Sequence, residues 1–414
     1  MTAVKRFFYQ HRIFFGLFAF ILIYETVVGN NCSPWLVNDH FFVFYVVDFS
    51  MGFCSRILPG AIYRLLFNEA TTRAVSVYAS VLLIVFFAGV CVFLEKLVLH
   101  TSKENKMLCL FFVLLFITGP ASFSLFVSWL GVIDFYWVLL TLLFFVFLSK
   151  KQLYILIPFL FSLCIFVHYG AMVSYIPMMA IIILYKISVS GEKGEKKLLW
   201  AVFSLSVIFA FVTTLYFMLF ERQNLVYDMQ EFDSLILERG AKYTYYYDYE
   251  FYKSISAQMG VSADDYIFSD GNLIMRLLKL VQTQFESTFN RDFKIGSMQE
   301  LAFAGLVLVP VAGVIFSAIF EKVFKSGEKN AVKKFSLSLV PLLFLLTLVF
   351  GTLFSTDTFR WLSHTLLPLF TVFLYVAYYE GDSIFNGIRR KLNFLPVPAA
   401  ALFFILYASC APTL

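Results

Sequence analysis

Three stretches of this sequence place a charged side chain within an otherwise apolar run, where it could take part in chemistry. Asp48 stands in VVDFSMGFCSRILPG, Asp134 in WLGVIDFYW and Arg360 in FSTDTFRWLSH. A carboxylate can remove a proton from an acceptor hydroxyl, and an arginine can hold a phosphate through two parallel hydrogen bonds. The combination favours transfer of a group from a phosphate-linked donor to a hydroxyl.

Ten residues in or near such stretches form the candidate site that we predict. The expected catalytic residues are Asp48, Asp134 and Asp39; the expected phosphate-binding residues are Arg56, Arg360 and His168; and the expected substrate pocket consists of Asp357, Trp361, His364 and Tyr245. None of the ten is assigned to a metal. The breaks at Gly52 and Pro59 favour a kinked or re-entrant backbone that aims Asp48 inward.

Several of these residues also have a purely structural interpretation. Asp48 is equally suited to capping a short helix or to pairing with Arg56, eight residues further on, and Asp134 to capping the helix that follows it. Asp357 and Arg360 are three residues apart and suit an ion pair.

The other residues have structural alternatives too. His168 is suited to a hydrogen bond with a backbone carbonyl at the membrane interface, Trp361 to an interfacial anchor, and Asp39, beside His40, to an ordinary solvated patch. Tyr245 belongs to the run YTYYYDYEFY. That run suits an aromatic belt, a packed outer subdomain, or a surface that contacts sugar or lipid.

The composition sets the class of protein that must position these residues. The chain has 414 residues, of which 60% are apolar and only 14% charged, and its mean hydropathy is +0.81. These values exclude a soluble globular protein, a disordered chain, collagen and a small disulfide scaffold. Long apolar blocks separated by short charged clusters predict an all-α polytopic membrane protein.

Hydropathy predicts about eleven transmembrane helices, several of them shorter than the usual ~20 residues. The expected spans are 13–29, 74–95, 107–128, 133–149, 152–168, 170–186, 198–220, 301–320, 335–354, 364–379 and 395–412. The first is interpreted as a retained span rather than a signal peptide, because no small-residue cleavage site follows it. An odd number of spans places the two termini on opposite sides.

The basic residues alternate sharply between the connecting segments. Of the 32 basic residues, 20 fall in six segments on one side: Lys5, Arg6, Arg12, Lys96, Lys103, Lys106, Lys150, Lys151, Lys186, Lys193, Lys196, Lys197, Lys322, Lys325, Lys329, Lys333, Lys334, Arg389, Arg390 and Lys391. The short segments of the other side carry only Arg56, Arg64, Arg73 and Arg360. Basic loops stay cytoplasmic, so we expect a cytoplasmic N-terminus, an outward C-terminus and, most simply, a bacterial inner membrane.

Two large segments then face outward and divide the chain. An N-terminal transmembrane module (1–220) contains the first outward loop (30–73), an outward loop or subdomain follows (221–300), and a C-terminal transmembrane module (301–414) completes the chain. The first loop includes GAIYRLLFNEA, whose apolar spacing predicts an amphipathic helix at the interface. All ten candidate residues map to this outer side, which predicts one shared polar site there.

With this architecture the chain resembles the GT-C superfamily of integral-membrane glycosyltransferases, which use polyprenyl-phosphate-linked sugars. The resemblance covers the topology of the whole chain, with Asp48 or Asp39 in a long first outward loop and Asp134 as a second acidic position. It implies a GT-C-like fold with the active site at the outer face. The chain departs from the family in having no adjacent acidic pair in the first loop and no large soluble C-terminal domain.

The resemblance also implies partners. These are a polyprenyl-phosphate-linked sugar donor, an acceptor that is a glycan, a lipid or a protein, and the surrounding membrane lipids, with no nucleic acid. It implies no certain cofactor and leaves open a divalent metal, Mg²⁺ or Mn²⁺.

Two other functions remain open from the sequence. An O-antigen-type polysaccharide polymerase or ligase has a similar number of spans and a large outward loop late in the chain, and relies on arginines and a histidine; here these would be Arg360, Arg222, Arg239 and His168. A transporter of lipid-linked sugars or solutes places its charges in mid-span, in two matched halves. Glu25 and Glu95 come nearest to that pattern, although both lie close to span ends.

Overall fold

The computed structural model describes residues 3–53, 56–119, 123–220, 226–227, 229–242, 309–322, 329–353 and 358–392. Every regular element within these ranges is a helix. In chain order the labelled helices are α1 (Ala3–Gln10), α2 (Arg12–Tyr24), η1 (Glu25–Gly29), α3 (Asp39–Val46), η2 (Phe49–Met51), α4 (Leu58–Leu66), α5 (Thr72–His100), α6 (Lys106–Thr118), α7 (Phe123–Ser128), α8 (Phe135–Leu148), η3 (Lys151–Leu156), α9 (Ile157–Val167), η4 (Tyr169–Val173), α10 (Tyr175–Val189), α11 (Lys193–Phe220), α12 (Met229–Glu238), α17 (Ala331–Leu353), α18 (Thr358–Glu380) and α19 (Asp382–Leu392).

Six helical segments of the described chain are long and apolar enough to cross a membrane. They are Arg12–Gly29, Thr72–His100, Lys106–Ser128, Lys193–Phe217, Ala331–Phe350 and Arg360–Glu380. Four shorter apolar helices are Phe135–Leu148, Lys151–Val167, Tyr175–Val189 and Val309–Phe320. Each of these ten segments overlaps one predicted span, which confirms the all-α class for the described residues. The count of about eleven stays a prediction, because four helices are short and 395–412 lies outside the described residues.

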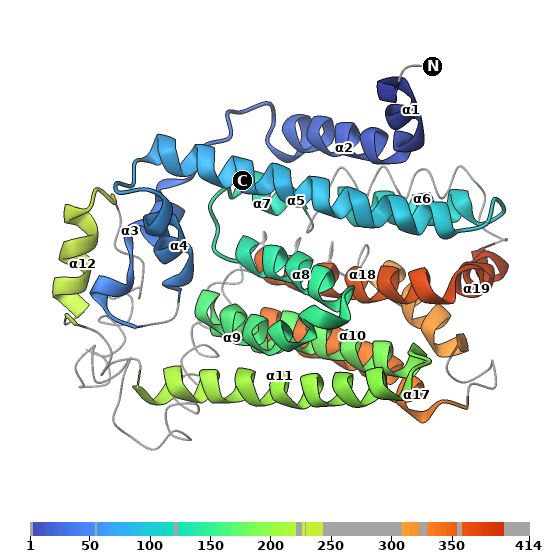
Figure 1. Cartoon of the computed structure of the whole chain (residues 1–414). Helices are drawn as coiled ribbons and strands as arrows, with labels where there is room; N and C mark the ends of the chain where they lie inside the picture. The colour runs from blue at the N-terminus through green and yellow to red at the C-terminus, as the bar shows by residue number, and fades with distance from the viewer. Residues whose placement is uncertain are drawn as a thin grey trace.

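The long helices run side by side, with α3, α4 and α12 at one end and α1 and α19 at the opposite end (Figure 1). Hydrogen bonds at the α19 end join segments that are far apart in the sequence: Ser102 and Asn105 with Asp382, Arg389 with Glu104, Lys151 with Glu192, Tyr185 with Glu380, and Asn330 with Ser188. All of these contacts lie in or beside segments predicted to face the cytoplasm. The predicted alternation of the chain therefore agrees with the spatial arrangement.

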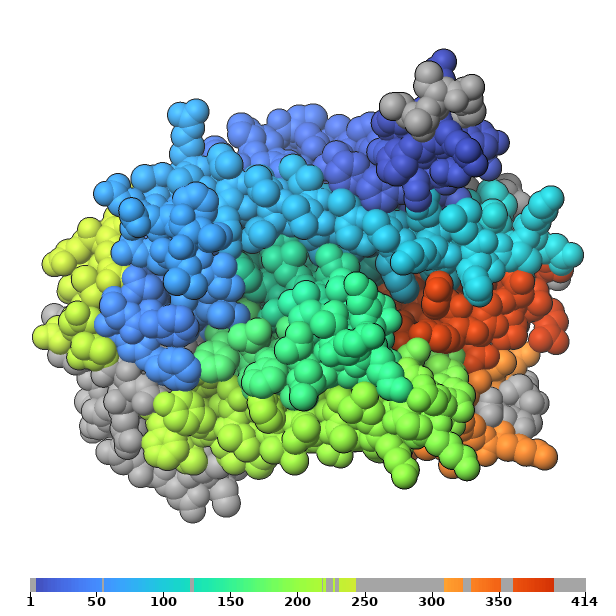
Figure 2. Space-filling view, viewed as in Figure 1, coloured from blue at the N-terminus to red at the C-terminus, as the bar shows by residue number. Residues whose placement is uncertain are grey.

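The segments predicted to face outward meet at the other end. Lys242 contacts Asp39 across 2.9 Å, and Arg239 contacts Asp48 across 3.0 Å. Both pairs join the residues that follow α12 to the loop around α3. In the space-filling view α12, in yellow-green, lies against the blue residues of this loop (Figure 2).

Helix α4 is the predicted helix of the first outward loop. Pro59 stands in its first turn, where its missing N–H costs nothing, and its buried face includes Gly60 and Tyr63. A side chain at Gly60 would overlap the backbone carbonyls of Phe44 and Val47, so glycine allows α4 to pack directly on the end of α3. Leu65 and Leu66, at the end of α4, are exposed.

Candidate functional site

Asp134 is the centre of a buried polar cluster between α8 and α18. It precedes the first residue of α8, and its side chain is fully buried. Arg360 donates Nε–H to Asp134 Oδ2 and Nη2–H to Oδ1, the second bond being 3.0 Å long. His364 Nε2 lies 3.0 Å from Oδ2. Because residues four apart share one face of a helix, α18 presents Arg360 and His364 to the same carboxylate.

Aromatic side chains enclose this cluster. The hydroxyl of Tyr175 lies 3.2 Å from His364 Nδ1, so both nitrogens of that ring have partners. The Trp137 ring lies 5.1 Å from the His364 ring, centroid to centroid, and its indole N–H donates to the Cys164 carbonyl. Trp361 is buried rather than exposed, so its interpretation as an interfacial anchor is wrong.

His168 links this cluster to the first outward loop. Arg56 Nη2 lies 3.1 Å from His168 Nε2, and the Gly170 N–H donates to His168 Nδ1 across 3.0 Å. Arg360, Asp134 and His364 are the other ionisable groups whose charges act on this ring. A side chain at Gly170 would lie about 3.1 Å from Trp361 and 3.3 Å from Trp137. Glycine at this position therefore lets the chain that follows His168 pack closely against both tryptophans.

The loop that carries Arg56 has an unusual backbone. Gly52 has a φ of 125°, and Arg56 has a φ of 65°, a conformation that non-glycine residues seldom adopt. The predicted kink at Gly52 is therefore present. Strained backbone of this kind persists where the surrounding structure holds it, and it concentrates at functional sites.

Asp48 lies in a second group of charges. It caps η2 by accepting hydrogen bonds from the N–H and the hydroxyl of Ser50. Arg239 Nη1 and Arg64 Nε lie 3.0 and 3.2 Å from Asp48 Oδ2. Burial alone would raise the pKa of Asp48, but the Ser50 hydrogen bonds and the two arginines outweigh it and lower that pKa.

The structural alternatives for Asp48 and Asp134 can now be compared with these contacts. The prediction that Asp48 caps a short helix is confirmed, but its arginine contacts are Arg64 and Arg239, whereas Arg56 contacts His168. Asp134 does occupy the N-cap position of α8, as the capping interpretation predicts, but its side chain makes no capping hydrogen bond.

The candidate residues thus fall into two groups. Asp134, Arg360, His364, His168, Arg56 and Trp361 belong to one, while Asp48 and the half-exposed Asp39 belong to the other. Asp357 and Tyr245 lie outside the described residues, as does Arg222. Tyr175 and Gly170 are not among the predicted residues, although both lie in the same FVHYGAMVSYIP stretch as His168. Proximity to a candidate histidine was the only signal available for them.

The donor set does not fit a divalent cation. Within the part of the chain that the structure describes, no group of three or more His, Cys, Asp or Glu side chains is placed to hold a metal ion. The carboxylates of Asp48 and Asp134 face arginines, whose positive charge repels a cation.

In the described ranges the protein is all-helical, its long apolar helices are consistent with an integral membrane protein, and its polar clusters lie at one end of the bundle. Comparison of the chain with models of protein families, with curated proteins and with solved structures finds no match in any of the three. Function must therefore be inferred from the residues themselves.

Proposed function

We propose that this protein is a membrane glycosyltransferase that moves a sugar from a polyprenyl-phosphate donor to an acceptor at the outer face of the membrane. In this proposal Arg56, His168 and Arg360 hold the phosphate of the donor. Asp134 keeps Arg360 and His364 in place, and Asp48 is the general base. The host membrane would be a bacterial inner membrane, with the N-terminus in the cytoplasm and the polar clusters facing outward.

The contact between Arg56 and His168 is the observation that carries the proposal. The Gly170 N–H occupies His168 Nδ1, so a neutral ring carries its proton on Nε2. Nε2–H therefore faces the guanidinium of Arg56, which can only donate. Two N–H donors this close together, one on Arg56 and one on His168, are suited to an anionic oxygen that accepts from both. Arg360, whose charge acts on the same ring, adds a second cation for a phosphate.

The transfer step then follows from these roles. Asp48 accepts the proton of the acceptor hydroxyl while the hydroxyl oxygen attacks the anomeric carbon. The bond between that carbon and the phosphate oxygen breaks, and its electron pair leaves with the phosphate. The arginines stabilise the charge that develops on the departing phosphate. Arg239 and Arg64 favour the ionised form of Asp48, which is the form a base requires.

A polysaccharide polymerase or ligase of the O-antigen type is the second candidate. Two observations favour it. Arginines pair with both Asp48 and Asp134, and Arg56, His168 and Arg360 belong to one cluster. Such an enzyme would use arginine and histidine without a carboxylate base. Asp48→Asn separates the two candidates: it abolishes transfer if Asp48 is the base and has a mild effect in the second case.

Both candidates require that Arg56, His168 and Arg360 bind the phosphate of the donor. Binding of a polyprenyl phosphate that carries no sugar tests this requirement. We expect the full-length protein in detergent to prefer the phosphate over the corresponding polyprenol, and Arg56→Gln to weaken phosphate binding about tenfold, the loss of a charge-assisted hydrogen bond. Arg389→Gln, at the opposite end of the bundle, is the matched control and should bind like the wild type. Equal binding of phosphate and alcohol would rule out a phosphate site at Arg56.

A further inference from the structure

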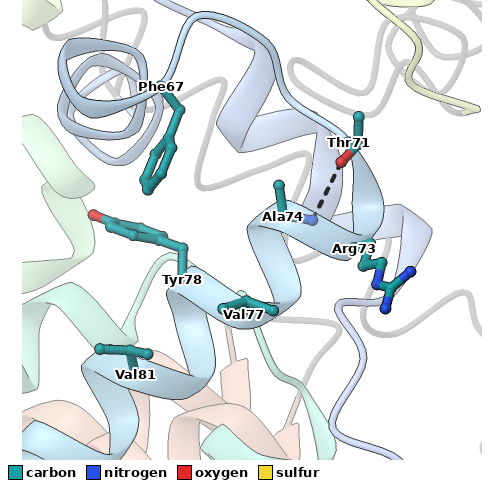
Figure 3. A pocket seen from close by; sticks show the side chains of 7 residues that line it. All are labelled: Phe67, Thr71, Arg73, Ala74, Val77, Tyr78 and Val81. Atoms are coloured by element: carbon teal, nitrogen blue, oxygen red, sulfur yellow. Dashed lines mark hydrogen bonds between the residues drawn. The ribbon is translucent and has the colours of Figure 1, made fainter.

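A groove follows the first turns of α5, on the outside of the helical bundle. It encloses about 470 Å³ and is lined mainly by apolar side chains. Arg73 stands at one end of the row of lining residues and Val81 at the other, with Val77 between them and the ring of Phe67 facing Tyr78 (Figure 3). None of these residues belongs to the candidate site.

Phe67 and Tyr78 form an aromatic wall of this groove, and contacts with Tyr63 and Tyr136 fix their positions. The rings of Phe67 and Tyr78 lie 6.0 Å apart and edge to face, and Tyr63 stacks on Phe67 at 4.9 Å. The buried Tyr136 hydroxyl donates to the Tyr78 hydroxyl across 3.3 Å, so the polar tip of Tyr78 is turned toward the protein interior. The wall formed by Phe67 and Tyr78 is therefore a preformed apolar surface, and packing a ligand against it requires little ordering.

The groove lies where α5 enters the membrane. With 29 residues, α5 is about 43 Å long, which exceeds a hydrocarbon core of about 30 Å and places its ends among the headgroups. Arg73 is its second residue, and Val81 lies about 12 Å further along the axis. Val77 and Val81 are 59% and 53% exposed, as side chains in contact with lipid would be.

We propose that this groove binds one anionic phospholipid of the bilayer, with its phosphate on Arg73 and an acyl chain along Val77 and Val81. The polarity of the groove matches that of a phospholipid, because the charged end lies at headgroup depth and the apolar end points into the membrane. An arginine suits a phosphate because its guanidinium is delocalised and donates through a fork.

Native mass spectrometry of the full-length protein tests this site with phosphatidylglycerol and phosphatidylcholine as probes. We expect one phosphatidylglycerol to bind more tightly than phosphatidylcholine. Arg73→Gln should lower the affinity for phosphatidylglycerol about fivefold, as expected for one basic residue near an anionic headgroup, and should leave phosphatidylcholine unchanged. Val81→Trp, which fills the groove, should weaken both lipids.

Val85→Trp is the matched control, because Val85 is 56% exposed on the same helix but does not line the groove. It should bind both lipids like the wild type, and thermal unfolding reports whether each tryptophan variant is folded. Unchanged phosphatidylglycerol binding by the folded Arg73→Gln and Val81→Trp variants would refute the site. Stronger binding of a polyprenyl phosphate that depends on Arg73, or a dimer that Val81→Trp abolishes, would assign the groove to another occupant and overturn the proposal.

Discussion

Arg360, His364 and complete burial leave Asp134 little freedom to act as a base, whereas the side chain of Asp48 is 16% exposed. Its two carboxylate oxygens accept hydrogen bonds from these residues, and its side chain has no exposure to solvent. A buried charge is tolerated only when it is paired, since burial removes its hydration. Asp134 is therefore best understood as the residue that positions the arginine and the histidine of the cluster.

Asp134→Asn should lower the free energy of unfolding by about 3–5 kcal/mol, because Arg360 would keep its charge in the cluster without a compensating carboxylate. The measurement is the thermal or denaturant midpoint in detergent. Asp39→Asn, which breaks the more exposed pair with Lys242, should cost about 1 kcal/mol or less. Equal effects of the two substitutions would mean that the Asp134 cluster is not buried as described.

Asp48 gives a pH dependence whose sign follows from its lowered pKa. The unfolded chain takes up the proton near the ordinary pKa of 3.8, above the value of the folded protein. The stability contributed by ionised Asp48 is therefore complete above about pH 5 and is lost as the pH falls through the folded pKa. We expect the wild type to be more stable than Asp48→Asn at pH 7, and this difference to shrink between pH 5 and pH 3. A difference that grows toward acid would contradict the Arg239 and Arg64 contacts.

At the scale of elements, direct contact between α3 and α4 shapes the loop that carries both Asp48 and Arg56. The glycine at position 60 brings α4 against the last turn of α3, and Gly52 and Arg56, between the two helices, have positive φ angles. Asp48 is thereby turned toward Arg64 of α4 and Arg239 beyond α12. The packing of two short helices thus decides which cations reach the carboxylate.

Gly60→Ala should destabilise the protein by roughly 1–3 kcal/mol, because the added methyl group meets backbone that cannot move aside. The same substitution at Gly16 in α2, where a methyl group would meet no atom within 4 Å, should stay within about 1 kcal/mol of the wild type. Unfolding midpoints in detergent compare the two variants. If Gly60→Ala were as stable as Gly16→Ala, the packing of α4 on α3 would be wrong.

At the scale of the whole molecule, the two ends of the bundle differ in charge. The α19 end joins basic segments that the sequence assigns to the cytoplasm, and the other end carries the two polar clusters. This division corresponds to the rule that lysine and arginine stay on the cytoplasmic side. The difference between the two ends therefore predicts which exposed residues a reagent outside the cell can reach.

A membrane-impermeant maleimide should label Asn68→Cys and Lys242→Cys in intact cells. It should label Glu104→Cys and Glu192→Cys only after the membrane is opened, because these exposed positions lie at the α19 end. Cys32 and Cys54 are first replaced by serine, since Cys32 is exposed. The reversed pattern would invert the orientation and place the polar clusters in the cytoplasm.

Hydropathy and charge in the sequence were sufficient to predict the helical class and ten segments that the structure describes as apolar helices. They were also sufficient to predict that Asp134, Arg360, His364 and His168 lie near one another, because all four stand where a predicted span meets the outer side. Spacing along the chain did not predict the partner of Asp48. Arg56 is eight residues away, yet the arginines that contact Asp48 are Arg64 and Arg239.

Local composition alone is enough to specify which segments enter the membrane, since the cost of burying peptide and charge in lipid acts on each segment separately. The pairing of individual charges has a different origin. Arg239 lies 191 residues from Asp48, and Arg360 lies 226 residues from Asp134, so packing of distant helices selects these partners. Tertiary structure decided that Asp134 is held and buried, because only neighbouring helices can exclude water from a carboxylate and supply its countercharge.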